Sequence, residues 1–323
     1  MKTQSKVNHK KKNKSISPKK IQTIGFLGLG IMGSAMAFNL IQAGFKVYGY
    51  DPSKVSAKQF KKSGGVFCNS ADEVVQAVDV IIMSLPTPAA LRVSTEVLLK
   101  NARPGLVIIE TSTLDIKDKE LARDALQKVG IHLLDCPLSG TGAQARNKDL
   151  TVYASGQSQA IKRLAPVFAG FSKAHFDLGQ FGNGMKMKLM ANLLVAIHNV
   201  STAEALLLGE RFGIPINTAV KVLSDGAGGS RMLQVRGPMM QKEGWLEATM
   251  KIDVWQKDMK LIGQALVDTN SPAPLFNSTV AIYNAAIGLG HGESDTAAVY
   301  DVLKRMSSKP LKIKRGFKDE VQR

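Results

Sequence analysis

The sequence predicts an α/β domain with a doubly wound, mostly parallel sheet, followed by an all-α domain that the chain enters through a long interdomain helix. Three observations support this fold class. Apolar strand patterns alternate with helical patterns over the first half of the chain, which is typical of a parallel sheet. One helical pattern, from Met185 to about Phe212, is much longer than the others. From there to residue 306 every pattern is helical.

These changes of pattern divide the chain into four parts. A basic tail (1–20) precedes the α/β domain (21–180), the helical domain (181–306) and a second basic tail (307–323). The first tail holds eight lysines, no acids and no hydrophobic periodicity, so we expect it to be disordered. Such a tail can bind nucleic acid through phosphate contacts, but a charge run is more often a solvated extension, and we do not favour nucleic acid as a partner.

Individual elements follow from the two hydrophobic periods. Short apolar runs predict strands at 24–29, 46–50, 66–67, 80–85, 106–110, 132–135 and 150–155. Helical patterns in the same half predict helices at 31–43, 53–62, 71–78, 89–100 and 116–128. In the second half the predicted helices are 185–212, 216–225, 230–240, 252–268, 274–288 and 295–306.

A glycine-rich turn follows the first strand. Gly28, Gly30 and Gly33 have G-x-G-x-x-G spacing, a helix begins among them, and the second strand ends at Asp51. The first glycine permits a tight turn, the second lets a pyrophosphate approach the backbone, and the third lets the helix pack on the sheet. The helix start attracts phosphate, and the acid accepts hydrogen bonds from a ribose. This order of elements predicts a Rossmann-type dinucleotide site. The intervening turn residues belong to that site as well: Leu29, Ile31 and Met32.

A secretory signal is the alternative interpretation of the same stretch. Lysines precede an uncharged run, and Ala35-Met36-Ala37 fits a cleavage site. Cleavage there would cut the helix of the glycine turn, and polar residues interrupt the run. We therefore favour the dinucleotide site and expect no membrane span.

Composition narrows the class further. The hydrophobic content of 44% is ordinary for a globular protein. The two cysteines, Cys68 and Cys136, suggest no disulfide framework, and a reducing cytoplasmic location is expected. The five histidines are scattered without zinc-ligand spacing, so no metal site is predicted.

A lysine and an asparagine share one face at the start of the long helix. Lys188 and Asn192 are four residues apart on an otherwise apolar segment. Burial lowers the pKa of a lysine toward the range needed for proton transfer, so Lys188 is a candidate general acid or base. Spacing alone leaves the alternative open that Lys188 extends to the surface.

Four separated motifs resemble those of the β-hydroxyacid dehydrogenase family, which includes 3-hydroxyisobutyrate dehydrogenase and is related to 6-phosphogluconate dehydrogenase. The opening motif reads GFLGLGIMGSAMAFNL, and the family's substrate motif appears at Asp135–Thr141 as DCPLSGT. The catalytic motif of the family places its lysine at Lys188, and a later motif appears as Lys257-Asp258. The resemblance covers about residues 22–305.

The resemblance implies the roles of several residues. Leu85, Pro86, Thr113 and Lys257 would lie near the cofactor at the strand ends. Ser139 and Gly140 would hold the substrate carboxylate. Lys188 would exchange the proton of the substrate hydroxyl, and Asn192 would be the orienting asparagine of the catalytic site. Two departures bear on substrate choice: Thr141 stands where the family has a second glycine, and Ala191 replaces the first of two asparagines.

Charge near the second strand predicts the cofactor. Asp51 would repel the 2′-phosphate of NADP, and Pro52 stands where NADP-dependent relatives often carry arginine. Lys54 is close in sequence but does not occupy that position. We therefore expect NAD, and NADP is disfavoured.

The resulting hypothesis is an NAD-dependent dehydrogenase of a small hydroxyacid. Segments 148–156 and 227–233 resemble sugar-acid members such as L-threonate dehydrogenase, and Ser230 and Arg231 would supply extra polar contacts. Arg231 as a surface residue paired with an acid is the alternative. An imine reductase on the same fold and a non-catalytic dinucleotide-binding module with a nucleic-acid-binding tail are the competing functions. The family suggests a homodimer or homotetramer built through residues 185–300.

Overall fold

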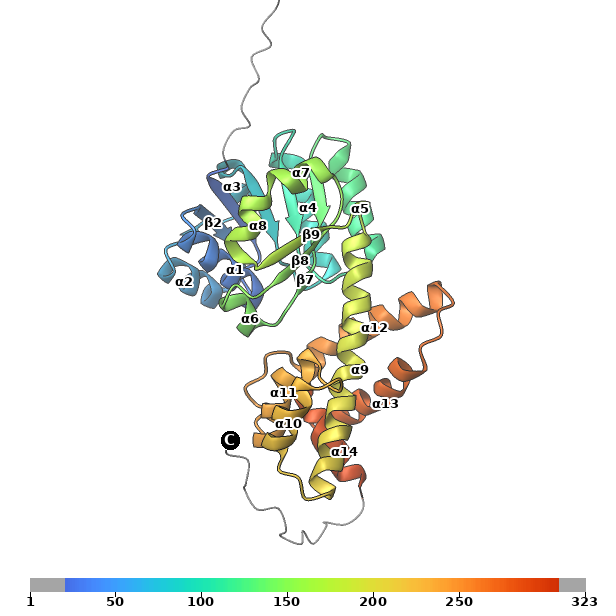
Figure 1. Cartoon of the computed structure of the whole chain (residues 1–323). Helices are drawn as coiled ribbons and strands as arrows, with labels where there is room; N and C mark the ends of the chain where they lie inside the picture. The colour runs from blue at the N-terminus through green and yellow to red at the C-terminus, as the bar shows by residue number, and fades with distance from the viewer. Residues whose placement is uncertain (1–20, 308–323) are drawn as a thin grey trace, which may run out of the picture.

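The computed structural model describes residues 21–307, which form two lobes joined by one long helix, α9 (Asn183–Arg211) (Figure 1). The N-terminal tail predicted at 1–20 lies outside these residues, as does the C-terminal tail beyond Ser307.

The first lobe is built on a six-stranded sheet whose strand pairs are all parallel, in the order β3-β2-β1-β4-β5-β6. Its strands are β1 (Thr23–Leu27), β2 (Lys46–Tyr50), β3 (Val66–Phe67), β4 (Val80–Met83), β5 (Val107–Glu110) and β6 (His132–Asp135). The order reverses between β1 and β4, so the glycine turn after β1 lies at the switch point where doubly wound sheets bind ligands. The predicted doubly wound fold class is confirmed.

Helices cover both faces of this sheet (Figure 1). They are α1 (Ile31–Gln42), α2 (Lys54–Lys62), α3 (Ala71–Ala77), α4 (Pro88–Asn101) and α5 (Ile116–Gln127). Successive strand residues point to opposite faces, so each central strand contributes to two cores. In β4, Ile82 packs with α1, whereas Ile81 packs with α3, α4 and α5. Polar side chains cap the last four of these helices, as at Ser53 before α2 and Thr87 before α4.

A second sheet corrects the strand assignment. The strand predicted at 150–155, β8 (Thr151–Ala154), does not join the main sheet but pairs with β7 (Leu138–Ser139) and β9 (Ala174–Asp177). The sequence analysis also missed α6 (Gly142–Arg146), α7 (Ser158–Arg163) and α8 (Ala165–Phe171). These segments are too short for a hydrophobic period to identify them.

The second lobe is helical around α9. It contains α10 (Ile216–Asp225), α11 (Arg231–Lys242), α12 (Ile252–Asp268), α13 (Pro274–Gly288), a 3-10 turn (Thr296–Ala298) and α14 (Val299–Met306). Ala196, Val200, Ala203 and Leu206 of α9 are buried against these helices. Within residues 21–307, α9 is the one helix long and apolar enough to cross a membrane by length and composition, and core helices also pass that test.

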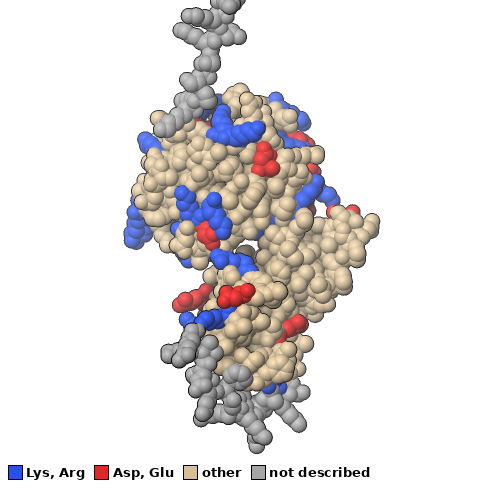
Figure 2. Space-filling view, in the orientation of Figure 1, with Lys and Arg blue, Asp and Glu red and all other residues tan. Residues whose placement is uncertain are grey.

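The surface is hollowed between the lobes, and basic and acidic side chains lie along the hollow (Figure 2). Away from α9, polar side chains of residues 21–307 also make contacts between the lobes. Nζ of Lys257 donates to the Thr113 carbonyl at 2.6 Å, and Arg231 pairs with Asp149 at 3.2 Å. Lys117 and Asp268 form a longer, exposed pair at 3.8 Å.

Candidate active site between the lobes

The glycine turn has the shape that a dinucleotide requires. Gly28 has a φ of +95°, and a Cβ there would lie 2.3 Å from the Ser84 carbonyl oxygen. A Cβ at Gly33 would lie 2.1 Å from the Gly28 carbonyl oxygen. At Gly30, by contrast, a Cβ would meet nothing within 4 Å, and no side chain caps α1. The open backbone and uncapped helix start fit a pyrophosphate.

Asp51 lies at the end of β2, beside the glycine turn. Its Oδ2 accepts the Leu29 N–H at 2.7 Å, and its Oδ1 accepts the Ser53 N–H at 2.8 Å. These bonds hold the carboxylate in one orientation. The predicted neighbours Ile31 and Met32 form the first turn of α1, where Ile31 is exposed and Met32 is half-buried.

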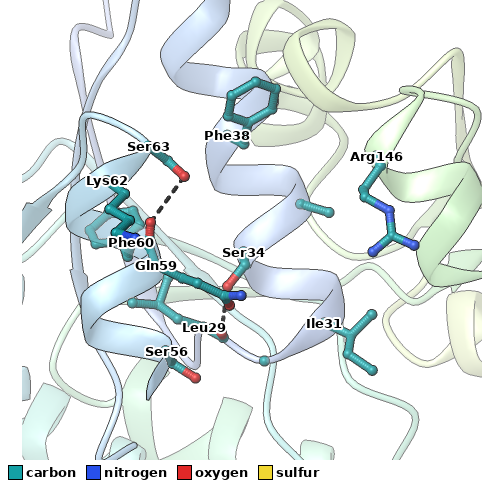
Figure 3. A pocket seen from close by; sticks show the side chains of 12 residues that line it. Leu29, Ile31, Ser34, Phe38, Ser56, Gln59, Phe60, Lys62, Ser63 and Arg146 are labelled. Carbon is teal, nitrogen blue, oxygen red and sulfur yellow. Dashed lines mark hydrogen bonds between the residues drawn. The ribbon is translucent and has the colours of Figure 1, made fainter. Parts of the chain in front are cut away.

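A pocket of about 660 Å³ adjoins this turn (Figure 3). Leu29, Gly30 and Ile31 line it together with residues of α1 and α2 and with Arg146 of α6. The Ser34 hydroxyl donates to the Leu29 carbonyl at its edge. Asp51, Leu85, Pro86 and Thr113 do not line this pocket, so it covers one end of the predicted cofactor site.

The remaining cofactor candidates gather at the carboxyl ends of β4 and β5. Leu85 and Pro86 follow β4, and the Leu85 N–H donates to the Ser112 hydroxyl at 2.8 Å. Thr113 follows β5, and its carbonyl oxygen accepts a hydrogen bond from Nζ of Lys257 in α12. The fold therefore brings Lys257 to the strand ends from 144 residues away.

Lys188 is buried, with 9% of its surface exposed. Burial lowers the pKa of its ammonium group; the Asp258 carboxylate opposes this shift and the Lys257 cation adds to it. Asn192, one turn further along α9, donates its side-chain N–H to Asp258 Oδ2 at 2.8 Å. Extension of Lys188 to the surface is therefore wrong, because this face of α9 turns inward.

A second pocket, of about 100 Å³, lies between the lobes and contains this lysine. Of the predicted substrate residues, six line it: Ser139, Gly140, Thr141, Lys188, Asn192 and Arg231. Ser230 does not, because its hydroxyl caps α11 by accepting the Leu233 N–H at 3.1 Å. Arg231 is 59% exposed and pairs with Asp149 at the pocket's edge.

Thr141 has a local structural role in this chain. Its hydroxyl accepts the Gln144 N–H, and the Gln144 side chain accepts the Thr141 N–H, which makes a capping box for α6. Gly140 before it has a φ of +135°, which favours glycine. Thr141, which stands where the family has a second glycine, thus caps the start of α6 beside the pocket.

The predicted site left out Trp255 and Arg236, which line this pocket, and Asp258, which accepts the hydrogen bond from Asn192. Asp258 and Trp255 occur on the buried face of α12. Arg236 occurs on the buried face of α11, between Leu233 and Met240. For Asp258 and Arg236 the sequence contained a usable signal. Each is a charged residue at a position where the helical period predicts an apolar one, and a charge at such a position is buried only when it has a partner.

A buried charge cluster anchors the start of α9. Lys119 of α5 lies 2.6 Å from Glu110 Oε2 and 2.7 Å from Asp135 Oδ1, and all three side chains are almost fully buried. Asp135 Oδ2 accepts the Met185 N–H at 2.8 Å and the Ser155 hydroxyl at 3.1 Å. Asp135 therefore ties β6 to the helix that carries Lys188. Among residues 21–307, no three histidine, cysteine or acidic side chains are grouped to hold a metal.

Two family models match the chain. Residues 23–179 match the NAD-binding domain of 6-phosphogluconate dehydrogenase. Residues 182–303 match a model described as NAD-binding of NADP-dependent 3-hydroxyisobutyrate dehydrogenase.

Three relatives illustrate the similarity. Glyoxylate/succinic semialdehyde reductase 1 of Arabidopsis thaliana is 32% identical, covering 87% of this chain and 98% of its own. L-Threonate dehydrogenase of Haemophilus influenzae is 27% identical, covering 88% and 96%. A solved structure of Mycobacterium tuberculosis 3-hydroxyisobutyrate dehydrogenase with L-serine has a TM-score of 0.79 and 28% identity, covering 88% and 99%.

Proposed function

Because this chain belongs to the β-hydroxyacid dehydrogenase family and is an NAD(P)-dependent oxidoreductase, we propose that it reversibly oxidises the hydroxyl of a small β-hydroxyacid with NAD. The substrate would resemble 3-hydroxyisobutyrate or a sugar acid such as threonate or glycerate. The observation that carries the proposal is the pocket in which buried Lys188 meets the Ser139-Gly140 loop.

Lys188 would act as the general acid and base. In oxidation its neutral Nζ takes the hydroxyl proton while the carbinol hydrogen leaves with its electron pair and the C=O bond forms. The nicotinamide, when bound, supplies the hydride acceptor. In the reverse direction the protonated Nζ returns the proton to the carbonyl oxygen. Donors at Ser139 and Gly140 would hold the substrate carboxylate, and Asn192, oriented by Asp258, keeps its amide oxygen as an acceptor.

The test is NADH formation by the purified protein with 3-hydroxyisobutyrate, threonate, glycerate and 6-phosphogluconate. Turnover of at least one acid supports the proposal. No turnover of any acid, with NADH binding demonstrated, would count against it. The imine-reductase alternative would then be assayed, although buried Lys188 favours the exchange of a hydroxyl proton.

Two opposite pH shifts are expected from the neighbours of Lys188. Oxidation needs the neutral amine, so kcat/KM rises with pH through the pKa of Lys188. Asp258→Asn removes a carboxylate that raises this pKa and should move the rise to lower pH. Lys257→Met removes a cation that lowers it and should move the rise to higher pH.

The measurement is the pH profile of kcat/KM for the three proteins in the oxidation direction. Exposed Lys260→Met, on the same helix, is the control and should leave the profile in place. Shifts of the same sign in Asp258→Asn and Lys257→Met would contradict the electrostatic account.

NAD is the proposed cofactor because the Asp51 carboxylate is held beside the glycine turn by two N–H groups. Asp51→Asn removes the charge and keeps an acceptor oxygen. We expect the ratio of kcat/KM for NAD over NADP to fall about tenfold, the equivalent of about 1.4 kcal/mol. Exposed Lys54→Ala serves as the control. A wild-type protein that uses NADP as well as NAD would refute the preference.

A homodimer or homotetramer and a reducing, cytoplasmic location complete the proposal. Large apolar side chains of α9 are exposed, including Met190, Leu194 and Leu208, which supports a partner surface on this helix. Cys68 and Cys136 are free and buried, as suits a reducing compartment. Sedimentation as a monomer would exclude the assembly.

A further inference from the structure

Arg236 is a buried cation that the catalytic scheme does not use. Its side chain is 2% exposed, and its Nε lies 3.1 Å from Asp295 Oδ1. It comes from α11, on the helical lobe, and lines the same 100 Å³ pocket as Lys188 and Asn192. A buried arginine is stable only when its charge and its donors find partners.

Asp295 holds Arg236 in a set orientation. Asp295 Oδ2 accepts the N–H groups of Thr249 and Met250 and the Thr249 hydroxyl, at 2.8–3.0 Å. Its Oδ1 accepts the Ala297 N–H at 3.0 Å in addition to Arg236. These donors hold the carboxylate in place, and it contacts the guanidinium through Nε.

The outer edge of the guanidinium is left for a ligand. Nη1 contacts the Met232 thioether, which is a weak acceptor. Within residues 21–307, no acceptor is hydrogen-bonded to Nη2 of Arg236. Arg236 thus presents charged, planar donors to a pocket whose other walls hold the reacting groups.

We propose that Arg236 binds a second carboxylate of the substrate, on an arm remote from the reacting carbon, which makes the preferred substrate a hydroxy-dicarboxylic acid. This inference rests on the reaction proposed above and narrows its substrate: the methyl or hydroxylated arm of the acids named there is replaced by an arm that carries a carboxylate. A guanidinium offers donors only and matches the two oxygens of a carboxylate. A hydroxyl on the arm can accept one hydrogen bond from Arg236 but carries no charge and lacks the second oxygen of a carboxylate, and a methyl arm would leave the buried donors unpaired.

The test uses three 3-hydroxypropanoates that differ only in the substituent at carbon 2: methyl, hydroxymethyl or 2-carboxyethyl. The wild-type kcat/KM should be highest for the carboxyethyl acid. Arg236→Gln should lower the carboxyethyl-to-methyl ratio of kcat/KM at least tenfold, and Arg236→Lys, which keeps the charge but not the planar fork, should lower it less. Lys242→Gln is the control, because Lys242 is an exposed cation at the far end of the same helix α11 and does not line the pocket, and it should leave the ratio within threefold.

A binding measurement keeps the inference separate from turnover. Calorimetry with NADH-loaded protein compares glutarate with butyrate, which differ in one carboxylate. The wild type should bind glutarate at least tenfold more tightly, and Arg236→Gln should remove that difference even if none of the three acids is oxidised. Failure of the proposed function alone would abolish turnover but leave this difference.

Four results would overturn the inference. They are equal binding of glutarate and butyrate by the wild type, a wild-type preference for the methyl or hydroxymethyl acid, an unchanged ratio in Arg236→Gln, and an equal fall of the ratio in Lys242→Gln. If Arg236→Gln does not fold, the wild-type comparison of glutarate with butyrate decides the inference.

Discussion

Lys188→Ala is expected to lower kcat by roughly 10²–10⁴-fold, the usual contribution of a general acid or base. Without Nζ, none of the described side chains that line this pocket is a carboxylate, an imidazole or an amine that could take the hydroxyl proton. Binding of NADH should persist, because the glycine turn and Asp51 belong to the other lobe. Initial rates in both directions, with fluorescence titration of NADH, measure the two effects.

Lys186→Ala is the matched control for this prediction. Lys186 lies two residues earlier on the same helix but is exposed, and its Nζ lies 3.4 Å from Asn183 Oδ1. Its removal should change kcat by less than about threefold, because exposed pairs contribute little. Turnover retained in Lys188→Ala, or lost equally in both variants, would remove Lys188 from the mechanism.

Among the substitutions proposed here, Lys119→Met is expected to cause the largest loss of stability, a decrease of about 3–5 kcal/mol in the free energy of unfolding. Burial alone would lower the pKa of Lys119, but the Asp135 and Glu110 carboxylates outweigh it and raise that pKa. Removing the ammonium leaves two buried carboxylates facing each other without a cation. Because their charge is then uncompensated, stability should recover in part as the pH falls and one carboxylate is protonated.

Urea unfolding across pH measures this effect. Lys117→Met, two residues away in α5, is the control, because Lys117 is 79% exposed and its pair with Asp268 spans 3.8 Å. It should change the free energy of unfolding by less than about 0.5 kcal/mol. A Lys119→Met protein within about 1 kcal/mol of the wild type would show that the cluster does not anchor α9.

The sequence by itself determined the main sheet, the long helix and the local motifs. β2, β6, α10, α12 and α13 have the predicted bounds, because each is long or regular enough to show its period. The glycine turn was equally readable, since its function depends on spacing and on residues that lack a side chain. The short elements α6, α7, α8, β7 and β9 were not, so the second sheet that contains the predicted strand β8 was missed.

Only the tertiary structure decided which charges are buried and with whom they pair. Lys188 and Asp258 are 70 residues apart in sequence, and nothing in the pattern around Lys188 distinguishes a buried amine from an exposed one. The same holds for Arg236, which meets Asp295 through the packing of α11 against the loop before the 3-10 turn. Periodicity predicts which residues lie on the same face of a helix or strand. The pKa of a side chain and the hydrogen-bond partners of its donors depend on which other elements the fold packs against that face.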